Sequence, residues 1–388
     1  MKPSFEVKRD SAIADWPWRT GNRFLLMDSS EHYFGRLIQA IDAAGSFVLL
    51  EMYLVESGAL AERFIEAFVR AAGRGVDVRL VLDGFGSMGL RQPDRDRLTS
   101  AGVELRFYNL VSLRKKLHNF LRDHRKLVIV DGRVAFVGGV GLTDEFGVAG
   151  PSGTPWRDLV VEISGPVVSD WQHAFARTWE RTGSPLSLQP PANEPLTGET
   201  ALGRVVLSEA WYRSALANAV ARRIGVANKR AWIMSAYFVP SRRFRKALRR
   251  AARRGVDVRL VVPGPLTDHP WVRHAARRFY GKLLRNGVRI FEYQPRVLHA
   301  KMTICDDWVS VGSSNLDRWS FKWNLEANQE IEDQAFADAA AAVFVKDCGL
   351  SLELDPQHWP KRAWVDRLQE RLAGLLDRWL DRWRRPHL

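Results

Sequence analysis

The segment AAGRGVDVRLVLDG, residues 71–84, returns almost unchanged as AARRGVDVRLVVPG, residues 251–264. In each copy a basic amphipathic pattern stops at a glycine, Gly75 or Gly255, and a β-branched run follows it. This order predicts a helix, then a strand that ends at a glycine-containing loop. Because the same pattern occurs twice at a fixed spacing, the chain is predicted to consist of two similar halves.

A second pair of matching segments follows the first pair. DHRKLVIVDGRVAFVGGVGL covers residues 123–142, and LHAKMTICDDWVSVGSSNL covers residues 298–316. Both read H-x-K-x4-D, then a β-rich run, then a glycine-led turn. Because this short motif stays nearly in register with an independent repeat, we interpret it as functional. The motif residues are His124, Lys126 and Asp131 in the first half, and His299, Lys301 and Asp306 in the second.

The H-x-K spacing has a chemical meaning. Residues i and i+2 of a strand point to the same face, so each histidine is expected to have an ammonium group beside it. Two such strands facing one another would surround a phosphate diester. The lysines would stabilise its oxygens, one neutral histidine would attack phosphorus, and the other, protonated, would protonate the leaving alkoxide. These roles require different environments for the two imidazoles.

Two roles are open for the aspartates of the motif. Asp131 precedes Gly132 between two β runs, where Asp-Gly favours a hairpin turn. Direct catalysis and a structural role therefore both remain open for Asp131 and Asp306. Lysine is not a usual metal ligand and two ammonium groups repel a divalent cation, so no metal is expected.

Chain length and the position of a linker-like segment predict the domain organisation. The 388 residues suit two α/β units, and SPLSLQPPANEPLTGET, residues 184–200, has the composition of a linker. Strands alternating with helical patterns predict, in each half, a mixed and largely buried sheet flanked by helices. The predicted units are a first domain (1–185), a linker (186–202), a second domain (203–358) and an amphipathic helical tail (359–388).

Composition limits the partners. A net charge of +14 favours an anionic partner, which leaves nucleic acid, an acidic membrane and a phosphate-rich substrate open. Two cysteines, Cys305 and Cys348, suit a reducing compartment. No apolar stretch approaches the ~20 residues that span a bilayer, and no signal peptide is recognisable, so any action on lipid is expected from the membrane surface.

The paired motifs resemble those of the phospholipase D superfamily, and the similarity covers nearly the whole chain. Flanking segments resemble its cardiolipin synthase branch of the B type. The resemblance implies two α/β halves with one active site at their interface, and transfer of a phosphatidyl group through a covalent phosphohistidine. It implies no cofactor, in agreement with the absence of a P-loop or Rossmann motif. The flanking segments are residues 18–34, 236–256, 285–301 and 311–331.

The resemblance also implies roles for individual residues. All six motif residues carry over as catalytic, with His124 as the nucleophile. Ser314 and Asn315 would donate hydrogen bonds near the phosphate, and Asp158 and Glu326 would orient the histidines. The first half departs from the pattern, because Gly141 stands where the family usually has an asparagine that matches Asn315.

The implied setting is the cytoplasmic side of a bacterial inner membrane. Phosphatidylglycerol in an anionic membrane is the favoured substrate, and no nucleic acid partner is expected, although a phospholipid hydrolase and a nuclease of the superfamily remain alternatives. In the tail, residues 365–388, apolar residues recur every three or four positions. This helix is expected either to lie in the headgroup region or to dock on protein. The sequence leaves the oligomeric state open.

Overall fold

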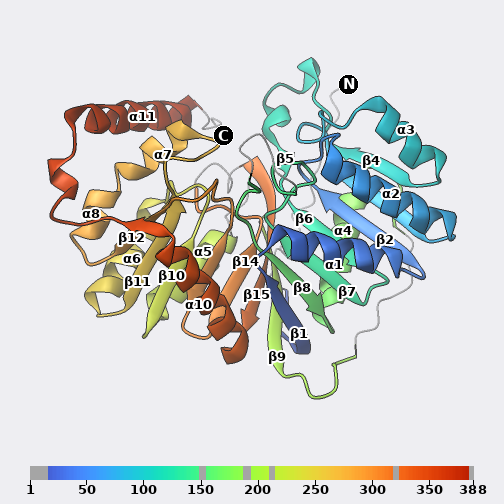
Figure 1. Cartoon of the computed structure of the whole chain (residues 1–388), viewed down its shortest axis with the longest axis horizontal. Coiled ribbons are helices and arrows are strands. Elements are labelled where there is room, and N and C mark those ends of the chain that lie inside the picture. The colour runs from blue at the N-terminus through green and yellow to red at the C-terminus, as the bar shows by residue number, and fades with distance from the viewer. Residues whose placement is uncertain (1–15, 148–153, 187–193, 209–214, 318–322, 384–388) are drawn as a thin grey trace, which may run out of the picture.

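One continuous sheet runs through the whole molecule (Figure 1). The computed structural model describes residues 16–147, 154–186, 194–208, 215–317 and 323–383. Within these residues the sheet has 16 strands, and its halves join where β1 (Arg19–Met27) pairs antiparallel with β9 (Ala201–Ser208). The prediction of two similar α/β halves is confirmed, and the β1–β9 pairing, which the sequence did not predict, fuses their two sheets edge to edge.

The strand order is the same on both sides of this seam. Outward from β1 come β8 (Val160–Ser164), β7 (Val134–Gly138), β6 (Lys126–Val130), β2 (Phe47–Met52), β3 (Asp77–Asp83) and β4 (Glu104–Tyr108). Outward from β9 come β15 (Asn324–Glu332), β14 (Trp308–Gly312), β13 (Met302–Cys305), β10 (Arg230–Met234), β11 (Asp257–Pro263) and β12 (Arg289–Tyr293), with β16 (Ser351–Glu353) added at the edge. The matching order gives the fold an approximate twofold axis at the seam.

Helices cover the sheet in both halves. The first half contributes α1 (Ser30–Asp42), α2 (Ala59–Gly73), α3 (Gln92–Ser100) and α4 (Val167–Glu180). The second half contributes α5 (Ala215–Val226), α6 (Arg242–Arg253), α7 (Pro270–Arg277), α8 (Tyr280–Leu284), α10 (Gln334–Gly349) and α11 (Trp364–Trp383). Short 3₁₀ segments occur at Leu113–Phe120 and Trp359–Lys361.

The hydrophobic cores tie the halves together. Residues of α1 and α2 pack on the first-half sheet in one core, and residues of α5 and α6 pack on the second-half sheet in another. A third core contains side chains from both halves, including Trp171 of α4 and Phe344 of α10. In addition, the Trp171 indole N–H donates to Gln329 of β15 at 2.8 Å. The face of the sheet opposite α1, α2, α5 and α6 is therefore buried under α4 and α10. The side chains of these two helices belong to one core that both halves share.

The duplicated segments fold as their pattern predicts. α2 leads through Gly75 into β3, and α6 leads through Gly255 into β11. Both glycines have positive φ, +85° and +89°, a conformation that only glycine adopts readily. The repeat thus places two equivalent strands, β3 and β11, in parallel pairs with β2 and β10.

The linker region differs in detail from the predicted range 186–202. Residues 187–193 lie outside the described residues. The remainder is held against the first half, because the Leu196 N–H donates to the Gly21 carbonyl at 2.9 Å. β9 already begins at Ala201, since this strand is needed to complete the seam.

Candidate active site

His124 lies between two short strands at the interface of the halves. It follows β5 (Arg122–Asp123), which pairs in parallel with β15 of the second half, and it precedes β6. The His124 N–H donates to the Leu325 carbonyl at 3.0 Å. Behind it, the buried Asp83 carboxylate accepts the Asp123 N–H at 2.9 Å and so holds the backbone that carries the imidazole.

His299 is fixed by an equivalent arrangement. Its backbone N–H donates to the Arg157 carbonyl at 2.8 Å, next to a β-bridge between Arg157 and Leu298. Its side chain is almost fully buried, and the ring centroids of Phe146 and Trp156 lie 5.1 and 5.6 Å from that of the imidazole. First-half aromatic residues therefore form part of the wall around the second-half histidine.

Each histidine is oriented by a carboxylate from the opposite half. His124 Nδ1 lies 3.1 Å from Glu326 Oε2, and His299 Nδ1 lies 2.7 Å from Asp158 Oδ2. Both carboxylates are buried, and Ser313 donates to Glu326 at 2.5 Å. Because Nδ1 of each ring faces a carboxylate, Nε2 is the nitrogen of each ring that no carboxylate holds. The sequence indicated the two carboxylates but not that they cross between the halves.

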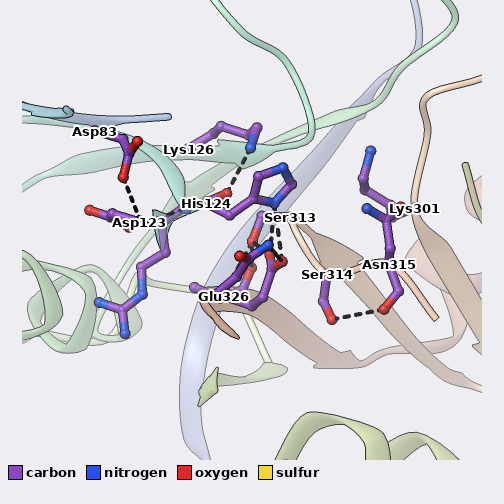
Figure 2. Close-up of polar contacts among 12 residues, drawn as sticks. Asp83, Asp123, His124, Lys126, Lys301, Ser313, Ser314, Asn315 and Glu326 are labelled. Atoms are coloured by element: carbon purple, nitrogen blue, oxygen red, sulfur yellow. Dashed lines mark hydrogen bonds and ion pairs between the residues drawn. The ribbon is translucent and has the colours of Figure 1, made fainter. Parts of the chain in front are cut away.

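The two lysines stand beside their histidines as the spacing predicts. Lys126 Nζ donates to the His124 carbonyl at 2.7 Å. Lys301 Nζ donates to the His299 carbonyl and lies within 3.2 Å of both ring nitrogens. Figure 2 shows Lys126 on one side of the His124 ring and Glu326 with Ser313 on the other, while Lys301 and Asn315 face this group from the second half.

The protonation states follow from burial. Burial lowers the pKa of His124 to about 4 against the opposing charge of Glu326, and lowers that of Lys126 to about 7. Burial also lowers the pKa values of His299 and Lys301. For Asp158, burial alone would raise the pKa, but the charge of Lys301 and the hydrogen bond from His299 outweigh it, and the pKa is lowered. In the free protein the imidazoles are therefore neutral at neutral pH.

These charges act within one site. The ammonium group of Lys301 lowers the pKa of both His124 and Lys126, although it belongs to the other half. In the same way, the charges of Asp158 and Glu326 both act on Lys301. The contacts of His124 with Glu326 and of His299 with Asp158 cross between the halves, so both H-x-K pairs lie at the same interface.

The motif aspartates lie elsewhere. Asp131 follows the far end of β6 and accepts the backbone N–H groups of Gly45, Ser46 and Phe47 at 2.8 to 2.9 Å. Asp306 follows β13 and accepts those of residues 228–230 at 2.9 to 3.0 Å. Both have positive φ at the turns of the β6–β7 and β13–β14 hairpins. Of the two roles left open by the sequence, these contacts support the structural one.

The turn after β14 differs from its counterpart in the first half. Ser314 N–H donates to Asn328 at 3.2 Å, and Asn315 Oδ1 is buried with no hydrogen-bond partner among the described residues. The equivalent first-half turn is Gly139–Gly141. A Cβ at Gly141 would come within 3.0 Å of Leu54, so an asparagine fits there only if Leu54 moves. The packing of Leu54 against Gly141 thus matches the difference between the halves that the sequence indicates, a glycine in the first half and Asn315 in the second.

Some residues near the histidines had no sequence signal of their own. The ring centroid of Tyr53 lies 4.6 Å from that of His124, and Lys126 Nζ lies 5.0 Å from the Tyr53 ring. In the second half, Tyr237 lies 6.4 Å from His299 and its hydroxyl donates to Asp268. The two tyrosines follow the matching strands β2 and β10, so comparing the residues after these strands could have found them.

Comparison with known proteins agrees with this geometry. The model of the family described as "Cardiolipin synthase, PLD-like domain" matches residues 37–179 and 220–348. The chain belongs to this family. Among curated relatives of this phospholipase D-like family, cardiolipin synthase B of Shigella flexneri is 34% identical over 92% of this chain and 88% of the relative. Cardiolipin synthase A of Pseudomonas aeruginosa (strain LESB58) is 36% identical over 91% of this chain and 72% of the relative.

Two solved structures of other proteins have a fold similar to that of this chain. Phosphatidylserine synthase of Haemophilus influenzae Rd KW20 superposes with a TM-score of 0.70 at 12% identity, covering 94% of this chain and 95% of that one. Polyphosphate kinase of Porphyromonas gingivalis superposes with a TM-score of 0.59 at 13% identity, covering 86% of this chain and 49% of that one. At such identities the likeness shows a shared architecture and nothing about substrate.

Proposed function

We propose that this protein is a cardiolipin synthase that transfers a phosphatidyl group from one phosphatidylglycerol to another and releases glycerol. The observation that carries the proposal is the pair of imidazoles with Nδ1 held by buried carboxylates, next to two buried ammonium groups. The curated relatives named cardiolipin synthase, similar over most of the chain, support the choice of substrate.

In the first step, His124 Nε2 attacks phosphorus and the bond to the glycerol oxygen breaks. We assign attack to His124, as the resemblance to the family implies, and its pKa of about 4 keeps the ring neutral for this role. His299 is proposed to take up a proton when the negatively charged phosphodiester binds beside it and Asp158, and it gives this proton to the departing glycerol oxygen. Lys126 and Lys301 stabilise the negative charge on the phosphate oxygens. The product is a phosphatidyl group on His124.

In the second step, a hydroxyl of another phosphatidylglycerol gives its proton to His299 and attacks phosphorus. The bond from phosphorus to His124 breaks, cardiolipin leaves, and the starting protonation states return. The amide N–H groups of Asn315 and the hydroxyl of Ser314 are proposed to donate to the phosphate, and the buried Asn315 Oδ1 is proposed to accept a hydroxyl of the incoming headgroup. Asp131 and Asp306 are proposed to stabilise hairpins and to take no part in the reaction.

The proposed setting is the cytoplasmic face of a bacterial inner membrane, with the protein bound peripherally. In the described part of the chain, no helix is long and apolar enough to cross a bilayer. The substrate lipids are proposed to be reached from the surface of the membrane. No nucleic acid partner, cofactor or resident metal is part of the proposal.

The direct test is incubation of the purified protein with phosphatidylglycerol in mixed micelles that contain EDTA. Cardiolipin and free glycerol should form in equal amounts, and His124→Ala and His299→Ala should abolish both products. Phosphatidic acid as the main lipid product would instead identify a phospholipid hydrolase. Cleavage of DNA or RNA without lipid turnover would identify a nuclease and overturn the proposal.

A further inference from the structure

The C-terminal helix α11 leaves an apolar stripe exposed. The helix packs on α7 through its other side, where Glu370 and Gly374 are buried, the Glu370 carboxylate pairs with Arg277 and Arg362, and Arg278 donates to the Gly374 carbonyl. A 3.6-residue period places the exposed apolar residues together on a neighbouring face of the helix. These residues are Trp364, Val365, Leu368, Leu372 and Leu375, each 43% to 68% exposed, and together they form what we name the α11 stripe.

Two connected basic grooves lie beside α6, and the first of them reaches the stripe at Leu375. The first, of about 670 Å³, lies between α6, the junction of α7 with α8, and α11, and the second, of about 790 Å³, lies between α6 and α8. They share Arg242, Arg245, Arg278 and Phe279, and we name them together the basic groove. Glu370 is a carboxylate in its lining, and that group is already paired with two arginines. The groove is therefore suited to phosphate groups, with apolar side chains at its rim.

The repeat shows that the high positive charge of α6 is not needed for a helix to form at this place in the fold. α6 occupies the place that α2 occupies in the first half, since both lead through an equivalent glycine into an equivalent strand. α2 carries acidic residues, Glu62 and Glu66, beside its arginines, whereas α6 reads RRFRKALRRAAR and contains no acidic residue. Both helices bury their apolar side against the sheet. An excess of positive charge on only one of two equivalent helices indicates a ligand there.

The active site and this surface lie at the same edge of the molecule. Figure 1 shows α11 at the top of the second half and β5, the strand that directly precedes His124, in the upper middle of the molecule. A single loop links the two places, because Asp268, which accepts the Tyr237 hydroxyl beside His299, lies two residues before α7 begins at Pro270. A membrane bound at α11 would therefore lie next to the site.

We propose that the α11 stripe and the basic groove together dock the protein on an anionic phospholipid bilayer. The stripe enters the region of the acyl chains, and the arginines and lysines of the groove bind lipid phosphates. The partner is a lipid surface and not a free phosphate or a nucleic acid, because the apolar stripe continues the groove. The inference rests on the proposed function only in placing the substrate in the same membrane.

The test is flotation with vesicles of phosphatidylcholine, with and without phosphatidylglycerol, in an inactive His124→Ala background so that the lipids stay unchanged. The groove variant is Arg242→Glu with Lys246→Glu, and the stripe variant is Leu368→Ser, Leu372→Ser and Leu375→Ser. The charge-matched control is Arg63→Glu with Arg91→Glu, at exposed first-half positions. Circular dichroism checks that every variant is folded.

We expect the parent to bind only vesicles that contain phosphatidylglycerol, with binding that weakens as salt rises. The groove and stripe variants should each bind about tenfold or more weakly, and the control should bind like the parent. Unchanged binding by either test variant overturns the proposal. So does a dimer that the stripe variant dissociates, or retention of DNA that the groove variant loses while vesicle binding is intact.

The outcome is separable from that of the proposed function. With His124 restored, the groove variant should still make cardiolipin from phosphatidylglycerol in detergent micelles, because the substituted residues do not touch the histidines. A protein that binds anionic vesicles but makes no cardiolipin in micelles would refute the proposed function and leave the docking surface standing.

Discussion

At the scale of single residues, the site depends on how each imidazole is held. Nδ1 of His124 is bonded to a buried carboxylate, and burial keeps the ring neutral despite that negative charge. A neutral ring with a fixed tautomer has an unprotonated lone pair on Nε2. This is the state that the proposed nucleophile requires at neutral pH.

Replacing Glu326 with glutamine should preserve the shape of the site but lower kcat by roughly 10²- to 10⁴-fold, because the amide can fix the wrong tautomer of His124. The measurement is glycerol release in micelles, with circular dichroism as the check on folding. Asp158→Asn should act similarly through His299. If both variants keep full activity, the carboxylates do not orient the histidines.

The pH dependence is a second residue-scale prediction. Because the pKa of His124 is about 4, lowering the pH from 7 to 5 leaves the ring neutral, so kcat/KM should not fall over this range. An ordinary histidine nucleophile would lose activity as the pH drops through about 6.5. Glycerol release in micelles with a nonionic detergent measures this. An acid limb near pH 6.5 in folded enzyme would contradict the assignment.

At the scale of elements, the H-x-K-x4-D motif separates into two functions along one strand. Its histidine and lysine stand at the start of β6 or β13, at the interface of the halves, while its aspartate closes the turn at the other end. For Asp306, burial would raise the pKa, but hydrogen bonds from three backbone N–H groups outweigh it and lower the pKa. The Asp306 carboxylate is thus stabilised in its charged form. In that form it holds residues 228–230, at the start of β10, by hydrogen bonds.

Asp131→Ala should therefore reduce stability and spare chemistry. The variant leaves three backbone N–H groups without their acceptor and puts alanine at a positive φ of 52°, which together should cost about 1–3 kcal/mol of unfolding free energy. Urea denaturation measures this cost. The kcat per folded molecule should stay within about threefold of the parent, and a loss comparable to that of His124→Ala would restore the catalytic interpretation.

The sequence predicted the elements well where the signal was local. The β-branched runs, the helix-ending glycines and the Asp131–Gly132 hairpin all occur as expected. The boundaries of the seam were not predictable, because the pairing of β1 with β9 joins segments about 180 residues apart and depends on which edges remain open after each half has folded. For the same reason, the sequence did not indicate that each carboxylate bonds to the histidine of the opposite half.

At the scale of the whole molecule, the two halves form one cooperative structure. The sheet is continuous, and one hydrophobic core contains α4 and α10 together with strands of both halves. Buried charge also crosses the interface, since Arg157 pairs with Asp347 at 2.9 Å. The linker composition predicts two domains, and the contacts show that these domains share their interior.

We therefore expect a single unfolding transition, in which the signals of both halves coincide in calorimetry and near-ultraviolet circular dichroism. Trp171→Ala should lower the stability of the whole protein by about 3–5 kcal/mol, because it empties a fully buried site in the shared core. Two separate transitions, of which only one shifts in the variant, would show that the halves unfold independently.

The crossed carboxylates have a consequence for synthesis of the chain. His124 meets its partner 202 residues later, at Glu326, so the ribosome has made most of the protein before the first imidazole can be oriented. Any product that stops earlier carries this histidine without the carboxylate that orients it. The proposed nucleophile can therefore reach its oriented form only after most of the chain has been translated.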